Sequence, residues 1–235
     1  MDIITMNKEE KNLLLLQFFG SSFPVGGFQH SYGLETYISK GLIGTVEELT
    51  DYLRSVIQQN YIGFDGRGFC KAYALAQQKQ EDRLWKLDQE LTAMRLSKEN
   101  RIASLKTGKA LLRISVAMIG DERLQLYLEK TRQENRLGNY CIVAGYLSGI
   151  MDIPLNQALQ AFYYSDLNNL LQVGIKVIPL GQTEGQGILY SLYSDIVAGV
   201  AETIATQEAE LENFVPYQNL MSMQHETLYS RLYMS

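Results

Sequence analysis

Cysteine and histidine are rare in this chain of 235 residues, and their scarcity excludes several kinds of site. The two cysteines, Cys70 and Cys141, are far apart in sequence, so neither a disulfide framework nor a thiolate zinc site is supported. We interpret both as buried thiols. The two histidines, His30 and His225, are also distant, which excludes an HExxH pair and leaves little room for histidine-based catalysis.

The chain also lacks an excess of positive charge and long apolar runs. Lys and Arg number 21 against 26 Asp and Glu, a net charge of −5 that repels phosphate backbones and anionic lipid, so we expect no nucleic-acid partner. Apolar runs such as residues 13–16 stop well short of the roughly 20 residues that a bilayer requires. The sequence does not open as a signal peptide does. We therefore expect a cytoplasmic protein without a membrane partner.

Proline is sparse as well, with four residues in the whole chain, which permits long helices. Thr45 and Glu48 have the spacing of a capping box, and apolar residues then recur at helical spacing. The glycines at positions 63, 66 and 68 predict a kink or a break in that helix. A second helix is expected to follow, over residues 70–78.

Further helices are indicated by apolar stripes and capping residues. One is expected over residues 82–96, and a second from an N-cap at Ser97 to a C-cap at Gly120. The small residues of 139–151 suit a helix that packs closely in the middle of a bundle. Pro154 is expected in the first turn of the next helix.

That next helix carries Asp166 on its apolar stripe, where the carboxylate either lies at the surface edge, the interpretation that we favour, or is paired or faces a partner. Another helical run extends from 185 to 207, and strand signals are weak throughout. The patterns together predict an all-α fold, a single domain over residues 1–235 that forms a bundle of roughly ten helices.

Three glycine-containing motifs were tested for catalytic or nucleotide-binding chemistry. Residues 181–187 (GQTEGQG) lack the Lys-Ser/Thr pair of a phosphate loop and follow a helical segment. Residues 63–68 (GFDGRG) have no βαβ unit around them, and Ser148 in 145–149 (GYLSG) lies one place away from a nucleophile elbow. We therefore expect no enzyme activity and no cofactor. The isolated chain should bind nickel weakly at most and should not bind GTP.

Two stretches are not explained by helix packing. Residues 21–35 (SSFPVGGFQHSYGLE) place a proline, three glycines and three aromatic residues between two apolar helices. This segment is either a buried loop or a contact surface where glycines allow backbones to approach. Residues 213–235 form an unusually apolar C-terminal segment. It either docks on its own bundle or folds upon binding another protein.

These stretches carry a resemblance to a known family. Residues 23–35 (FPVGGFxxSxGLE), 178–186 (IPLGQTEGQ) and 228–235 (LYSRLYMS) occur in the order found in the urease accessory protein UreF family. The resemblance spans nearly the whole chain. It implies an all-α, dimeric, non-catalytic chaperone for nickel insertion, which forms a complex with the accessory protein UreD (UreH in some species) and the GTPase UreG to activate apo-urease.

The resemblance also implies which residues bind partners. The positions that match the family motifs are Phe23, Pro24, Gly26, Gly27, Phe28, Ser31, Gly33, Glu35, Leu180, Gly181, Gln182, Gly185, Tyr229, Arg231, Leu232, Tyr233 and Ser235. The third group belongs to the segment that engages UreD in this family. The chain departs from the family pattern at Gln224, where a second histidine is common before His225, and at Met234, where a basic residue is expected.

The motifs lead to two specific expectations. Phe23 and Phe28 would form an apolar patch that a symmetric homodimer buries. Tyr229, Leu232 and Tyr233 would be the anchors of a short terminal helix in a groove, with Arg231 free for a charge-assisted contact. Two alternative classes remain open at this point, namely an all-α regulatory or scaffold protein of another pathway and a helical enzyme with a dispersed site.

Overall fold

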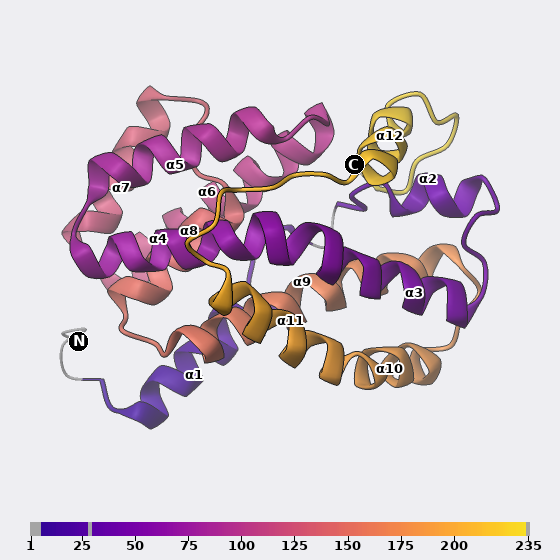
Figure 1. The fold of residues 1–235 in the computed structure, drawn as a ribbon, viewed down its shortest axis with the longest axis horizontal. Helices are drawn as coiled ribbons and strands as arrows, with labels where there is room; N and C mark the ends of the chain where they lie inside the picture. The colour runs from indigo at the N-terminus through magenta and orange to yellow at the C-terminus, as the bar shows by residue number, and fades with distance from the viewer. Residues whose placement is uncertain (1–5, 28–29, 234–235) are drawn as a thin grey trace.

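Helical periodicity is realised along the chain in a computed structural model that describes residues 6–27 and 30–233. Within these ranges there are twelve α-helices, one π-helix and no strand (Figure 1). The helices are α1 (Lys8–Phe18), α2 (Leu34–Ser39), α3 (Val46–Val56), η3 (Ile57–Asp65), α4 (Gly66–Gln78), α5 (Glu81–Met94), α6 (Lys98–Ile119), α7 (Glu122–Gln133), α8 (Tyr140–Ile150), α9 (Leu155–Val177), α10 (Gln182–Ser191), α11 (Tyr193–Ala205) and α12 (Pro216–His225). The predicted all-α bundle of roughly ten helices is confirmed.

The centre of the bundle is the close packing of α8 on α4. A Cβ atom at Gly145 would lie 2.2 Å from the backbone oxygen of Phe69, so only glycine allows the two helices to approach this closely. Every residue of α8 is buried. The small residues of 139–151 therefore have the packing role that their composition predicts.

An aromatic cluster around Phe162 of α9 extends this core to other helices. Its ring centroid lies 5.2 Å from that of Phe69 on α4 and 5.4 Å from that of Tyr140 on α8. Phe19, directly after α1, contacts the same ring at 6.3 Å. Such offset and edge contacts contribute about 0.5–1.5 kcal/mol each beyond the burial of apolar area. Cys70 and Cys141 are buried free thiols, as predicted.

Local capping signals fix the helix starts as predicted. Thr45 Oγ1 accepts the Glu48 N–H at 3.2 Å, and the Glu48 carboxylate accepts the Thr45 N–H at 3.1 Å. Ser97 Oγ accepts the N–H of Asn100, and Gly120 ends α6 with φ of 73°. Pro154 lies at the N-cap of α9, one residue before the first turn where it was expected.

A kink or a break was predicted near Gly63, Gly66 and Gly68, and the break is wrong, because residues 57–65 form a π-helix. The chain remains helical from α3 through the π-helix η3 into α4. The backbone of η3 winds in the wider turn of a π-helix, so the glycines do not end the helix. A Cβ atom at Gly66 would lie 2.1 Å from the hydroxyl oxygen of Tyr163, which explains the glycine as a point of close contact with α9. The expected single helix over 185–207 is likewise corrected, because α10 and α11 meet at an angle of 41°.

The C-terminal part returns across the bundle before its last helix. The segment between α11 and α12 runs over η3 and α5, where the Glu212 N–H donates to Gly63 O at 2.9 Å and the Asn213 side chain donates to Met94 O at 2.7 Å. This path carries α12 to α2 and α6, at the opposite end from α1 (Figure 1).

No single helix in the described ranges is long and apolar enough to cross a membrane, although the bent pair α10 and α11 passes that test by length and composition.

Candidate functional site

The loop between α1 and α2, which contains the first family motif, is mostly buried. Phe23 is only 7% exposed and packs edge-on against Phe18, with ring centroids 5.2 Å apart. Gly27 and Ser31 are buried, whereas Pro24 is exposed. The expected apolar surface patch at Phe23 is therefore wrong, because this ring fills the space beside α1. Phe28 lies outside the described residues.

Gly33 brings this loop against the C-terminal helix. It adopts the left-handed conformation with φ of 89°, and a Cβ atom there would lie 2.9 Å from the backbone nitrogen of Ser222 on α12. Gly26 also has positive φ, at 76°, and is half-buried. The glycine at position 33 is required both by its backbone angle and by the contact with α12.

Glu35, at the start of α2, is the residue that joins the first motif to the third. Its carboxylate accepts the Leu232 N–H at 2.7 Å and the Tyr233 N–H at 3.2 Å. The same carboxylate lies 2.9 Å from His225 Nε2 at the end of α12. Glu35 is only 5% exposed, so all three contacts form in a region sheltered from water.

Glu99, in the first turn of α6, completes the network from the other side. Its carboxylate lies 2.8 Å from His225 Nδ1 and accepts from Arg231 Nη1 at 3.3 Å. His225 is completely buried between the two carboxylates. Because a neutral imidazole can donate through only one nitrogen, only the imidazolium donates to both Glu35 and Glu99. We refer to Glu35, Glu99, His225 and Arg231 as the clasp.

Hydroxyl and amide groups hold α12 on α6 beside the clasp. Ser97 Oγ lies 2.7 Å from Ser222 Oγ, which donates to the side-chain oxygen of Asn100 at 2.6 Å. Met221 is buried on the same helix. The first half of the C-terminal segment therefore docks on its own bundle, which is one of the two alternatives that the sequence left open.

The last described residues behave differently from α12. Residues 226–233 are not helical, and the side chains of Tyr229 and Leu232 are fully or largely exposed, at 107% and 71%. Tyr233 is half-buried, and Arg231 is exposed although it pairs with Glu99. The segment is held by backbone bonds to Glu35, by the contact of Arg231 with Glu99 and by the packing of Tyr233 against the core. Ser235 lies outside the described residues.

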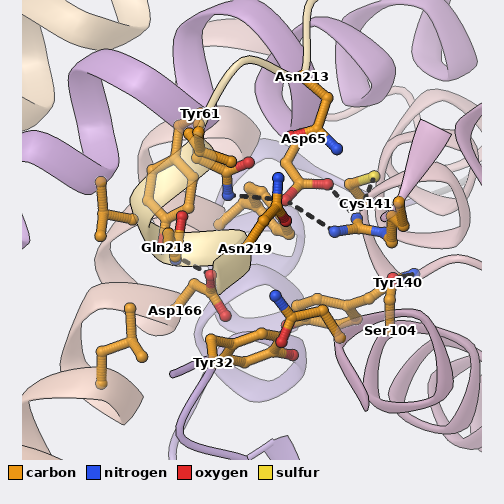
Figure 2. A pocket seen from close by; sticks show the side chains of 17 residues that line it. Tyr32, Tyr61, Asp65, Ser104, Tyr140, Cys141, Asp166, Asn213, Gln218 and Asn219 are labelled. Atoms are coloured by element: carbon orange, nitrogen blue, oxygen red, sulfur yellow. Dashed lines mark hydrogen bonds and ion pairs between the residues drawn. The ribbon is translucent and has the colours of Figure 1, made fainter. Parts of the chain in front are cut away.

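A polar cavity of about 40 Å³ lies beneath α12, as Figure 2 shows. On one side the Tyr61 hydroxyl donates to Asp166 at 2.6 Å, and on the other the Asp65 carboxylate pairs with Arg95. The side-chain nitrogen of Asn219 on α12 lines the same cavity and has no hydrogen-bond partner within the described chain. Helix α12 therefore covers a cavity that is lined by the charged side chains of Asp65, Arg95 and Asp166.

Asp166 is half-buried and paired with Tyr61, which matches the alternative of a paired carboxylate rather than that of a simple surface-edge one. Desolvation raises its pKa to about 6, and nearby Asp65 adds to this rise, while the hydrogen bond from Tyr61 and the charge of Arg95 oppose it. The sequence could not indicate this environment, because Tyr61 is 105 positions away. The two carboxylates and one guanidinium leave one negative charge beneath α12 whenever Asp166 is ionised.

The second family motif lies in another part of the fold. Gly181 precedes α10, and its N–H donates to the Glu184 carboxylate at 2.7 Å. Gly185 is buried against Ile175 of α9, whereas Gln182 is exposed and Leu180 half-buried. Helix α10 packs mainly on α9, while α12 packs mainly on α2. The structure thus brings the first and third motifs together through Glu35, and places the second on a separate surface.

Sequence reasoning also missed a surface cluster of tyrosines. Tyr164 on α9 lies beside Tyr193 on α11, with ring centroids 6.3 Å apart, and Tyr190 of α10 lies 5.3 Å from Tyr193. The exposed fractions of Tyr190 and Tyr193 are 73% and 46%, and Val197 on the same helix is 55% exposed. The residues come from three helices, so only their spatial proximity reveals the cluster.

The described residues contain no group of three or more His, Cys, Asp or Glu side chains placed to hold a metal ion. Ser148, considered for nucleophilic chemistry, is buried within α8 and donates to Ala144 O at 2.8 Å. The glycine-rich run that includes residues 182–187 is part of helix α10 rather than a loop. The polar groups of these motifs are therefore engaged in the helices themselves.

Comparison of the chain with known proteins identifies its family. The UreF family model matches residues 43–193. The urease accessory protein UreF of Actinobacillus pleuropneumoniae serotype 5b (strain L20) is 33% identical over 221 residues, which cover 94% of this chain and 97% of the relative. The protein of the same name from Haemophilus influenzae (strain PittEE) is 32% identical over 232 residues, 98% and 99% of the two chains. That of Lachnoclostridium phytofermentans is 32% identical over 224 residues. The chain therefore belongs to the UreF family of urease accessory proteins.

Proposed function

We propose that this chain is a non-catalytic adaptor of urease maturation in the cytoplasm. It would form a complex with UreD (UreH) and the GTPase UreG, and through that complex act as a chaperone for the insertion of nickel into apo-urease. Family membership supports this role over that of a scaffold from another pathway. UreG would supply the hydrolysis of GTP, and this chain would supply surfaces that hold the partners together.

The observation that carries the proposal is the exposed end of the C-terminal segment. Tyr229 and Leu232 present large apolar side chains to solvent, while the backbone of 232–233 is fixed on Glu35. Exposed apolar groups that are rimmed by polar contacts are typical of protein interaction sites. We assign this segment to UreD binding, with α12 as the fixed base from which it extends.

The same proposal includes a homodimer, on a different surface from the one first expected. Phe23 is buried, so it cannot contribute an apolar patch. The exposed cluster of Tyr164, Tyr190, Tyr193 and Val197 offers one instead, and aromatic residues are enriched in the centres of interfaces. A twofold axis through such a cluster would bury the same residues on both copies.

Paired substitutions test the assignment of the C-terminal segment. Tyr229→Ser with Leu232→Ser removes the exposed apolar groups, whereas Leu13→Ser with Leu16→Ser removes similarly exposed leucines from α1. Each variant is co-expressed with UreD, UreG and apo-urease, and UreD recovery, urease activity and melting temperature are measured. We expect at least a tenfold loss of UreD recovery and of activity in the first variant alone, with unchanged melting. Equal recovery in both variants would contradict the proposal.

A further inference from the structure

A basic groove runs between α6 and α7, away from the surfaces considered above. It has a volume of about 490 Å³ and is lined by Lys106, Lys109, Ala110, Arg113, Leu128, Thr131 and Arg132. Four of these seven residues are cations and none is acidic, although the whole chain has a net charge of −5. Glu99 of the clasp lies in the first turn of α6, whereas the groove uses the middle of the helix.

The described residues that line this groove include four cations and no carboxylate. Some lysine and arginine residues elsewhere pair with carboxylates, as Lys11 does with Asp152 and Arg123 with Asp121. Within the described ranges none of the groove cations forms an ion pair. The lining of the groove therefore holds no carboxylate that offsets their charge.

Lys109 is held in the groove by the backbone beside it. Gly138 has φ of 102°, and a Cβ atom there would lie 2.8 Å from Lys109 Cγ, so the glycine leaves space for the aliphatic stem. Partial burial lowers the pKa of Lys109, although buried Asp88 opposes this effect. A half-buried ammonium without a carboxylate partner loses hydration, and an anionic ligand would offset that loss.

The shape and spacing of the groove favour a helix as its ligand. Lys106, Lys109 and Arg113 follow one face of α6 and span about 10 Å at 1.5 Å per residue. Acidic residues at positions i, i+3 and i+7 of a second helix have the same spacing. The partly buried side chains of Ala110 and Leu128 provide apolar area between the cations. A groove of this kind accepts the apolar stripe of an amphipathic helix.

We propose that the groove between α6 and α7 binds an acidic amphipathic helix of a partner protein. Carboxylates of that helix would pair with the cations on α6 and with Arg132, while its apolar stripe would cover Leu128. A nucleic acid fits less well, because a phosphate backbone offers no apolar counterpart to Ala110 and Leu128. This inference does not depend on the role of the C-terminal segment.

A labelled helical peptide of sixteen residues, with leucines on one face and glutamates at i, i+3 and i+7, is the probe for this groove. The matched probes are the same peptide with glutamine for glutamate and a sixteen-nucleotide oligothymidine. Binding to the full chain is measured by fluorescence anisotropy. The variant Lys109→Glu with Arg113→Glu is compared with Lys8→Glu with Lys176→Glu, a pair of exposed lysines that gives the same change in net charge.

We expect the acidic peptide to bind the unaltered chain, to bind the groove variant at least tenfold more weakly, and to bind the control variant within twofold. The glutamine peptide should bind at least tenfold more weakly than the acidic one. If the groove variant melts early, Lys109→Met with Arg113→Gln takes its place, with at least a fivefold loss expected. The proposal is overturned by absence of saturable binding, by equal losses in both charge variants, by equal binding of the glutamine peptide or by tighter binding of oligothymidine.

Discussion

The imidazole Nε2 of His225 lies 2.9 Å from the carboxylate of Glu35, although 190 positions separate the two residues in sequence. This contact connects the end of α12 to the start of α2. Glu99 occupies the other ring nitrogen at 2.8 Å, so the histidine is enclosed by carboxylates from two helices. The clasp therefore lies where α12 ends and the exposed residues of the C-terminal segment begin.

Replacement of this histidine tests the contribution of the clasp to the fold. His225→Ala would remove the buried ring that bridges Glu35 and Glu99, and loss of a buried hydrogen-bonding partner costs about 1–3 kcal/mol. We expect a lower free energy of unfolding in urea and faster proteolysis within residues 226–233. A variant with unchanged stability and unchanged proteolysis would show that α12 is held by its other contacts.

The close approach at Gly33 gives a matched pair of substitutions. Gly33→Ala combines strain from a positive φ with a Cβ atom 2.9 Å from Ser222 N, whereas Gly41→Ala has positive φ but no atom within 4 Å of the added group. Strain alone costs about 1–2 kcal/mol, and the clash adds to it only at Gly33. The difference in melting temperature measures the clash, and equal losses would contradict a tight contact between the loop and α12.

Buried Asp88 is expected to be the most sensitive carboxylate of α5. It accepts from the Tyr127 hydroxyl at 2.5 Å, from the Gly138 N–H at 2.6 Å and from the Asn139 side chain at 2.7 Å. Asp88→Ala leaves these donors unsatisfied, which costs about 3–5 kcal/mol in total. Asp82→Ala, at an exposed site of the same helix, is the control and should change the free energy of unfolding by less than about 0.5 kcal/mol.

The raised pKa of Asp166 predicts a specific pH dependence. With a folded pKa of about 6 against 3.8, the folded state binds more protons than the unfolded state between these values, so stability falls as pH rises from about 4 to 6. Asp166→Asn keeps an acceptor for Tyr61 and removes the buried charge. At pH 8 we expect this variant to be more stable by about 1–2 kcal/mol, and at pH 4 to show no gain. Urea denaturation at the two pH values measures both differences.

Local signals in the sequence predicted the helix boundaries well, because a cap is decided by a few neighbouring residues. The capping box of Thr45 and the glycine stop at Gly120 are of this kind. The path through η3 was not predictable in this way. It depends on how closely Gly66 approaches Tyr163, about a hundred positions further on, and a glycine that permits close packing has the same sequence signature as a glycine that ends a helix.

In the candidate site, too, local motifs could be read from the sequence, whereas contacts between distant residues could not. Glu35 and the C-terminal residues were indicated by family motifs, but the geometry that joins them depends on His225, to which the sequence assigned no role. The sequence indicates that Asp166 is either at the surface edge or paired, but its apolar stripe does not reveal Tyr61 or Arg95. The tyrosine cluster and the basic groove each combine residues of different helices, which become neighbours only in the folded chain.

Deletion of residues 229–235 tests the central claim most directly, because it removes the exposed end and leaves α12 and His225 in place. The truncated chain is co-expressed with UreD, and its melting temperature and UreD recovery are measured on the same preparation. Loss of the backbone bonds to Glu35 and of the Arg231 contact should lower the melting temperature by only about 2–4 °C. We predict that UreD recovery is abolished despite this small change. Undiminished recovery of UreD by the truncated chain would contradict the account.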